Sequence, residues 1–169
     1  MRSNLLLASI VGGLMAMAVQ PITAATVTPA LTGSWQFTLT PSTPPVPPVA
    51  QIPGLATFTA DGSVIETDGT EFVPMVSSTP LANPSTPGHG IWQPGPAVGT
   101  LYVQYISLAL DTNGGLYARN VTTMILSLNN AGNQFSGTYT TAQATVSGTT
   151  RIVASGKVSG QLIPHPALP

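Results

Sequence analysis

Residues 100–128 read TLYVQYISLALDTNGGLYARNVTTMILSL, and this stretch decides the fold class. It holds two long runs rich in β-branched and aromatic residues, separated by a polar, glycine-containing turn at 111–115. In the first run Leu101, Val103 and Tyr105 alternate with Tyr102, Ile106 and Leu108. Alternation with a period of two is typical of a strand with two different faces. The stretch therefore predicts two antiparallel strands, Thr100–Leu110 and Leu116–Leu128.

The same pattern recurs on both sides of this stretch. Gly33–Thr40 (GSWQFTLT) alternates apolar and hydroxylic residues, and convincing helical periodicity with caps is absent after residue 25. Further strands are predicted at Leu55–Ala60, Ser63–Thr67, Gly90–Gln93, Gln134–Val146 and Thr149–Ile163. The chain is thus expected to be all-β.

Turn residues and prolines divide these strands. Asp61-Gly62 predicts a two-residue type I′ hairpin. Six prolines in Pro41–Pro53 predict an extended, linker-like segment that cannot be a central strand. Six more in Pro74–Pro96 predict a long irregular crossing, interrupted near its end by Gly90–Gln93.

About eight sequential strands without crossover helices favour a single antiparallel up-and-down barrel, in which closure removes the exposed edges. The alternative is a two-sheet β-sandwich. We expect the barrel domain to occupy residues 26–163, followed by a flexible tail at 164–169.

Charge is scarce. The 169 residues contain four Lys or Arg and five Asp or Glu, and none of these lies between Arg2 and Asp61. A chain with so few cations lacks the footprint needed to bind nucleic acid. The absence of cysteine excludes disulfides and thiolate metal sites.

The N-terminus has the three parts of a secretory signal peptide. Arg2 precedes the apolar run Leu5–Val19, and small residues follow up to Ala25. This run is shorter than the roughly 20 residues that a membrane-spanning helix needs. The sequence predicts a signal peptide at 1–25, cleavage between Ala25 and Thr26, and a secreted or periplasmic protein without a stable membrane span.

Two resemblances accompany these patterns. Gly33-Ser34-Trp35 resembles the G-x-W signature of the calycin barrels, which include lipocalins, avidins and fatty-acid-binding proteins. The resemblance implies a lipocalin-like barrel in which Trp35 packs at the closed end and a basic residue of the last strand covers its ring. Arg151, or Lys157 in its place, would be that residue.

The segments ATFTADGSVIETDG (Ala56–Gly69) and TPGHGIWQ (Thr86–Gln93) resemble a group of uncharacterised bacterial secreted proteins. This resemblance implies a shared fold and brings no activity with it.

Four of the five carboxylates fall in the short acidic segment Asp61, Glu66, Asp68 and Glu71. Calcium binding is one interpretation, because hard cations take carboxylate oxygens. The spacing does not match an EF-hand, and a hairpin with solvated acids is favoured. No metal site or cofactor is predicted.

His89 lies between Gly88 and Gly90. A histidine can act as a general base near neutral pH, with Glu66 or Asp68 as its acidic partner. The alternative is a loop histidine that bonds a backbone carbonyl.

Several aromatic residues are candidates to line the barrel interior, together with one cation: Phe58, Trp92, Tyr102, Tyr105, Tyr117 and Arg119. They would either form a ligand cavity or simply fill a barrel of this size.

Three functional hypotheses follow. The first is a secreted, non-enzymatic barrel that binds a small apolar or neutral molecule. The second is a barrel enzyme of the isomerase, cyclase or hydratase type that uses His89 with Glu66 or Asp68. The third is a structural or adhesive surface module.

Overall fold

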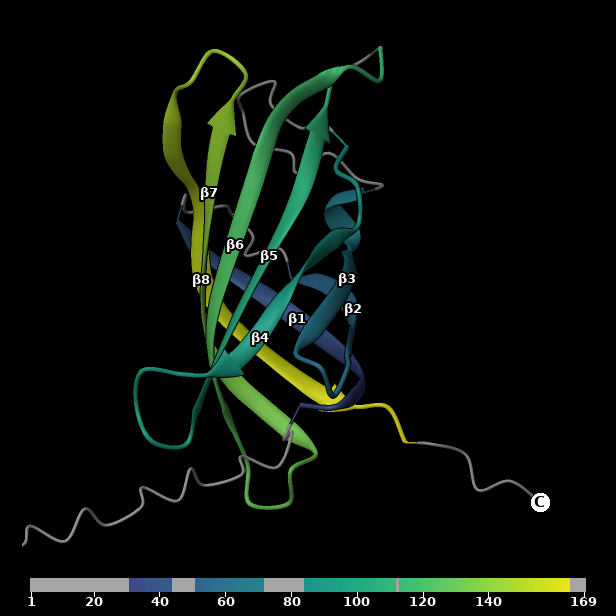
Figure 1. Cartoon of the computed structure of the whole chain (residues 1–169), viewed down its shortest axis with the longest axis vertical. Helices are drawn as coiled ribbons and strands as arrows, with labels where there is room; N and C mark the ends of the chain where they lie inside the picture. Colours follow the sequence, from purple (N-terminus) through teal and green to yellow (C-terminus); the bar gives the residue numbers. More distant parts are fainter. Residues whose placement is uncertain (1–30, 44–50, 72–83, 112, 165–169) are drawn as a thin grey trace, which may run out of the picture.

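A closed barrel of eight antiparallel strands forms the fold. The structure is a computed structural model that describes residues 31–43, 51–71, 84–111 and 113–164. Each strand pairs with its neighbours in sequence, and β8 closes onto β1 (Figure 1). The strands are β1 Gly33–Thr43, β2 Ile52–Phe58, β3 Ser63–Asp68, β4 Gly88–Pro94, β5 Thr100–Leu110, β6 Leu116–Leu128, β7 Gln134–Thr145 and β8 Thr150–Leu162. A short 3-10 turn, η1 Gly69–Glu71, follows β3.

This topology confirms the up-and-down barrel and excludes the sandwich. The architecture is consistent with a calycin-like fold. Within the described residues no helix is long and apolar enough to cross a membrane. The predicted signal peptide lies outside the described residues, as does most of the predicted tail.

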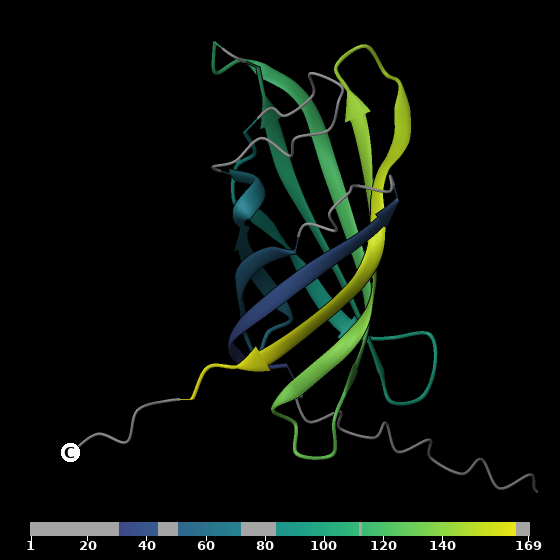
Figure 2. The same ribbon diagram turned by 180° about the vertical axis from the view of Figure 1, so that it is seen from behind.

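The barrel is taller on one side than on the other. Strands β5 to β8 have 11 to 13 residues, whereas β2, β3 and β4 have six or seven. At one end the long strands project beyond the short ones, and β1 crosses obliquely beside β8 (Figure 2). All strands therefore enclose the interior at one end of the barrel, whereas mainly the long strands β5 to β8 extend around it at the other end.

β1 and β2 both extend into the proline-rich segment that was predicted to separate them. β1 continues to Thr43, and β2 begins at Ile52, although both contain a proline. The β1–β2 pairing stops at Leu39 and Ile52, while Pro41 pairs only towards Gly156 of β8, next to an irregularity in register. A proline fits there because it need not donate to a ladder on both sides.

The Asp61-Gly62 hairpin is present, but its turn is not of type I′. Type I′ requires positive φ at both central residues, and here Gly62 has φ of 88° while Asp61 does not adopt a positive φ. Gly62 N donates to Thr59 O at 3.1 Å, and Thr59 N donates to Ser63 O at 3.0 Å. This is a type I turn closed by a glycine bulge.

A glycine in the same position occurs in three other hairpin turns. Gly114, Gly132 and Gly148 have φ of 81°, 67° and 90°, and each donates its N–H to the backbone oxygen three positions earlier, of Asp111, Asn129 or Thr145. Among the described residues, a glycine in the left-handed region is thus the fourth residue of four hairpin turns.

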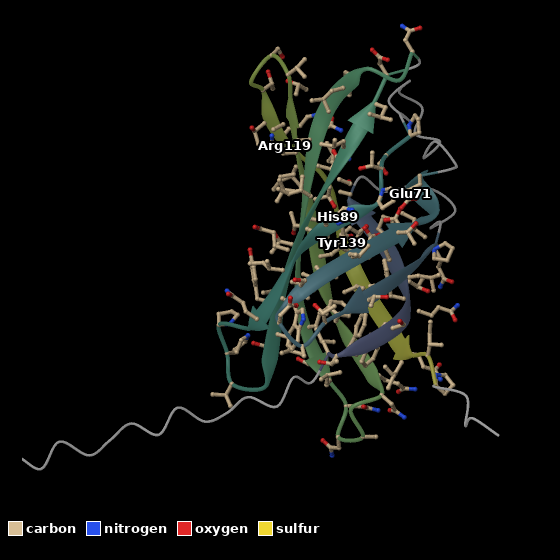
Figure 3. All side chains as sticks on the ribbon, turned by 45° about the vertical axis from the view of Figure 1, so that its right-hand side comes forward. Glu71, His89, Arg119 and Tyr139 are labelled. Carbon is tan, nitrogen blue, oxygen red and sulfur yellow. The ribbon has the colours of Figure 1, made fainter. Side chains whose placement is uncertain are left out.

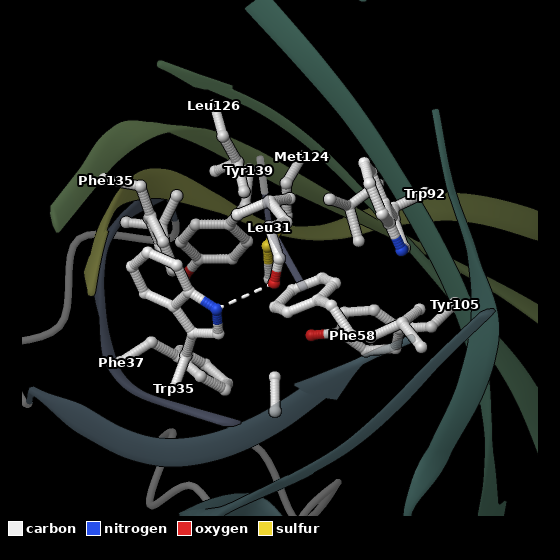
Figure 4. Close-up of a cluster of buried hydrophobic side chains, with 14 of the residues drawn as sticks. Leu31, Trp35, Phe37, Phe58, Trp92, Tyr105, Met124, Leu126, Phe135 and Tyr139 are labelled. Carbon is white, nitrogen blue, oxygen red and sulfur yellow. Dashed lines mark hydrogen bonds between the residues drawn. The ribbon is translucent and has the colours of Figure 1, made fainter. Parts of the chain in front are cut away.

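A cluster of apolar side chains fills the end of the barrel where β1 begins. Trp35 is fully buried and packs against Phe135, with ring centroids 5.2 Å apart and planes tilted by 43°. Its Nε1 donates to Leu31 O at 2.8 Å, shown dashed in Figure 4. Phe37, Phe58 and Leu126 complete this packing around the indole (Figure 4). We call this cluster the apolar end.

Candidate functional site: a buried polar cluster inside the barrel

Alternation along β3 places an acidic side chain inside the barrel. Val64 and Glu66 are buried, whereas Ile65 between them is 53% exposed. Glu66 is 4% exposed and follows the inward row that Val64 begins. A carboxyl group in such a position is rare unless it is paired or uncharged.

Glu66, on β3, reaches over a position of the neighbouring strand β4 where the wall has no side chain, Gly88. It is paired with Gly88 across the sheet, and the Gly88 backbone forms a hydrogen bond with its carboxyl group. A methyl group at Gly88 would lie 2.6 Å from Glu66 Oε2 and 2.5 Å from Tyr105 Cδ2. The glycine therefore leaves the space in which the carboxyl group and the Tyr105 ring meet.

Burial keeps the Glu66 carboxyl group protonated. Its pKa is raised from 4.5 to about 9, first by desolvation, then by the negative charge of Asp68, a hydrogen bond with Asp68 and the charge of Glu71. The Gly88 backbone hydrogen bond opposes this pKa shift. Near neutral pH Glu66 is thus an uncharged carboxylic acid, able both to donate and to accept a hydrogen bond.

Tyr105, on β5, extends the polar cluster from Glu66 to the adjacent strand β6. It is 4% exposed, and its pKa is raised well above the usual value by burial and by the charges of Glu66 and Asp68. A hydrogen bond with Thr122 opposes that shift. Thr122 is itself buried and shares a 2.9 Å hydrogen bond with Thr141 across β6 and β7.

Two buried polar atoms have no hydrogen-bond partner within the described residues. They are Oε1 of Glu66 and the hydroxyl oxygen of Tyr139. Tyr139 is 3% exposed, and its pKa is raised to about 12 by burial and by the charge of Asp68. An unsatisfied buried polar group costs about 1–3 kcal/mol, so two in one interior require an explanation.

Together these residues form a polar cluster above the apolar end. Its members are Glu66, Asp68, Tyr105, Thr122, Tyr139 and Thr141. Closer to the β7–β8 turn, Gln143 Nε2 donates to Asn120 Oδ1 at 3.0 Å across β6 and β7. The cluster can exchange neutral hydrogen bonds with a molecule whose remainder packs on apolar side chains.

The residues predicted to line the interior divide between the two faces. Phe58, Trp92 and Tyr105 are buried in the core cluster, and Trp92 Nε1 donates to Thr59 O at 2.9 Å. Tyr102 and Tyr117 are half-buried in the opposite rows of β5 and β6, and Arg119 is exposed. Figure 3 labels Arg119 on the part of the barrel where the long strands project. Alternate residues of each strand thus face the interior and the exterior of the barrel, and this alternation decides which predicted residues line the interior.

His89 does not lie on the same face as Glu66. It is exposed and is paired with Ile65 on one side and Ile106 on the other, both of which are exposed outer-face residues (Figure 3). Glu66 belongs to the inward row of the neighbouring strand. The sheet therefore separates the histidine from its expected acidic partner, and the two do not form an acid–base pair.

The predicted acidic segment is split by the same alternation. Asp61 caps the β2–β3 turn: its Oδ1 accepts a hydrogen bond from Ser63 N at 3.1 Å and another from Thr59 Oγ1. Glu71, in η1, accepts from Asp68 N at 3.2 Å. In the part of the chain that the structure describes, no group of three His, Cys, Asp or Glu residues is arranged to hold a metal ion.

The residue that packs on the Trp35 ring is not the basic residue that the calycin resemblance implied. Trp35 is paired with Leu162, at the end of β8 opposite to Arg151, and Lys157 is an exposed residue paired with Thr40. Arg151 is exposed and paired with Gln143. The aromatic ring of Phe135 packs on the indole instead, so an apolar contact stands where a cation was expected.

Sequence reasoning did not single out Tyr139, Thr122 or Thr141. Tyr139 lies four residues after Phe135, and both are buried, so period-two alternation in β7 was a usable signal. The threonines resembled the many hydroxylic residues of the outer rows, and no local feature marked them as inward.

No protein-family model matches the chain, and neither the curated proteins nor the solved structures gave a significant match.

Proposed function

We propose that the protein is a secreted, lipocalin-like barrel that binds a small, mainly apolar and uncharged molecule, without catalysis. The observation that carries this proposal is the buried Glu66 carboxyl group, whose Oε1 has no partner within the described residues. A barrel that needed nothing from its interior would be more stable with an apolar side chain there. A polar group kept inside at such a cost is the pattern of a ligand site with a few fixed polar contacts.

The surroundings of Glu66 support an uncharged ligand. Asp68 and Glu71 raise its pKa through their negative charge, and no basic side chain is among the groups that shift it. An anion in this interior would face repulsion and a large desolvation cost. The apolar end lies below the Glu66 carboxyl group, so the interior there is also uncharged.

Binding of N-phenylnaphthylamine, a neutral apolar dye that fluoresces in apolar surroundings, tests this proposal. We expect saturable fluorescence enhancement with one dye per chain and an increase in the midpoint of thermal unfolding. Arg119→Gln on the outer face is the matched control and should bind the dye as the parent protein does. Absence of saturable binding would contradict the proposal, and concentration-dependent self-association in its place would favour the surface-module hypothesis.

Export is part of the proposal and has its own test. We expect the chain recovered from outside the cytoplasm to begin at Thr26, which mass spectrometry of the intact protein measures. A recovered chain that still begins at Met1 would contradict cleavage.

A further inference from the structure

The two unpartnered atoms of the polar cluster identify the chemistry of the ligand's polar end. Glu66 is 4% exposed and Tyr139 is 3% exposed, and both couple electrostatically to Tyr105, which is buried between β4 and β6. The Glu66 carboxyl group is already hydrogen-bonded to Asp68 and leaves Oε1 open as an acceptor, whereas the phenol of Tyr139 can donate and accept. A group that does both without carrying a charge complements them best.

We propose that the ligand carries a hydroxyl group that hydrogen-bonds to the Glu66 carboxyl group, so that Glu66 selects neutral alcohols over carboxylic acids and amines. This inference rests on the proposed function and specifies its ligand class. Tyr139 lines the same interior, and its hydroxyl group, which also lacks a partner within the described residues, is a second polar group available to the ligand.

A carboxylate is disfavoured by the groups that face Glu66. Asp68 and Glu71 come from β3 and η1, Tyr105 from β5 and Tyr139 from β7, while β4 contributes Gly88 and turns His89 outward. Among these described neighbours the ionised groups are acidic, so a second negative charge is repelled. A fatty acid would therefore bind poorly.

An ammonium group is disfavoured by donor count. It has three N–H donors, whereas the described residues offer two unpartnered oxygens, Glu66 Oε1 and the Tyr139 hydroxyl, so one donor would stay unsatisfied in the interior. Binding it as an ion pair would also require loss of the Glu66 proton, which burial holds in place. A hydroxyl group needs neither change.

Competition against N-phenylnaphthylamine tests this selectivity near neutral pH. The competitors are a saturated long-chain alcohol, fatty acid and alkylamine of one chain length. We expect the alcohol to compete at least about tenfold more strongly than the acid or the amine. If the acid or the amine competes as well as the alcohol does, the inference is wrong. Saturable binding of the dye would still support the proposed function.

Two substitutions locate the selectivity at Glu66. Glu66→Gln keeps a donor and an acceptor and should keep the alcohol preference, whereas Glu66→Leu should weaken alcohol binding about three- to tenfold, the worth of one neutral hydrogen bond. His89→Gln, on the outer face of the adjacent strand, is the matched control and should change nothing.

The outcomes separate the two proposals. If Glu66→Leu binds the dye normally and the alcohol as tightly as the parent protein does, Glu66 is not the selecting residue and the inference is wrong. If the parent protein binds neither dye nor alcohol, the proposed function fails and the inference falls with it. Should Glu66→Leu not fold, the ranking of the three competitors on the parent protein still decides.

Discussion

The two ends of the barrel interior differ in what they do for the fold. At the apolar end, Trp35, Phe37 and Phe135 pack together, and the indole N–H is satisfied by Leu31 O at 2.8 Å. In the polar cluster, Glu66 and Tyr139 are as deeply buried, yet each has an atom without a partner within the described residues. Equal burial thus stabilises the fold at one end and costs stability at the other, which is how binding sites commonly differ from the scaffold that holds them.

The largest expected effect is at the apolar end. Trp35→Ala should lower the free energy of unfolding by about 3–5 kcal/mol, because it removes a fully buried ring and leaves a cavity. Urea denaturation measures this change, and Ile65→Ala, which truncates a side chain that is 53% exposed, is the control. A loss below about 1 kcal/mol for Trp35→Ala would show that the apolar end does not hold the barrel together.

The polar cluster should respond in the opposite direction. Glu66→Leu is expected to raise the free energy of unfolding by about 1–3 kcal/mol, because a buried carboxyl group whose Oε1 has no partner within the described residues is replaced by an apolar side chain. The measurement is the same urea denaturation on both proteins. A destabilised variant would mean that Glu66 supports the fold, and the contrast between the two ends would disappear.

The repeated turn allows a further comparison of the two ends, because Gly62 lies in the β2–β3 turn at the apolar end and Gly148 in the β7–β8 turn at the opposite end (Figure 1). Gly62→Ala and Gly148→Ala each impose a side chain on a left-handed residue, at a cost of about 1 kcal/mol. A methyl group at Gly62 would also lie 3.1 Å from Trp92 O, whereas nothing lies within 4 Å of the one at Gly148. We therefore expect a larger decrease in the unfolding midpoint for Gly62→Ala. Equal decreases would show that the added contact does not matter.

The smallest expected effect separates two tyrosines of the cluster. Tyr105→Phe removes a hydrogen bond with Thr122 and should cost about 0.5–1.5 kcal/mol. Tyr139→Phe removes a hydroxyl group that lacks a partner in the described part of the chain, and its unfolding free energy should stay the same or rise slightly. Thermal unfolding of the two variants side by side checks the difference; a larger loss for Tyr139→Phe would contradict it.

Much of the fold could be predicted because it follows from local patterns. Period-two alternation predicted Thr100–Leu110 and Leu116–Leu128 with the observed boundaries, and it placed Tyr105 opposite Tyr102. The type of the Asp61-Gly62 turn could not be predicted in this way. The same two residues occur in type I′ turns and in type I turns with a glycine bulge, and the closing hydrogen bonds decide between them.

The site was harder to predict because it depends on closure of the barrel. Glu66 and His89 differ by one position of register between β3 and β4, and a one-residue difference moves a side chain to the other face of a sheet. Because the chain has so few charged residues, composition alone made Glu66 one of a small number of candidates for a polar site. The partners that complete the cluster, Thr122 and Tyr139, come from β6 and β7, which only the closed barrel brings opposite β3.

The central claim is that Glu66 is kept as an uncharged acid inside the barrel at the expense of stability. Because its folded pKa of about 9 lies above the usual 4.5, the folded state holds a proton that the unfolded chain releases. Stability should therefore decrease as pH rises between these values, with a slope of up to about 1.4 kcal/mol per pH unit from this one group.

The most direct test is the free energy of unfolding across that pH range, measured for the parent protein and for Glu66→Gln, whose amide does not titrate. The account predicts that the difference between the two grows steadily in favour of Glu66→Gln from about pH 4.5 to about pH 9 and is constant above it. A difference that does not change with pH would contradict the account, since Glu66 would then be as exposed and as easily ionised in the folded protein as in the unfolded chain.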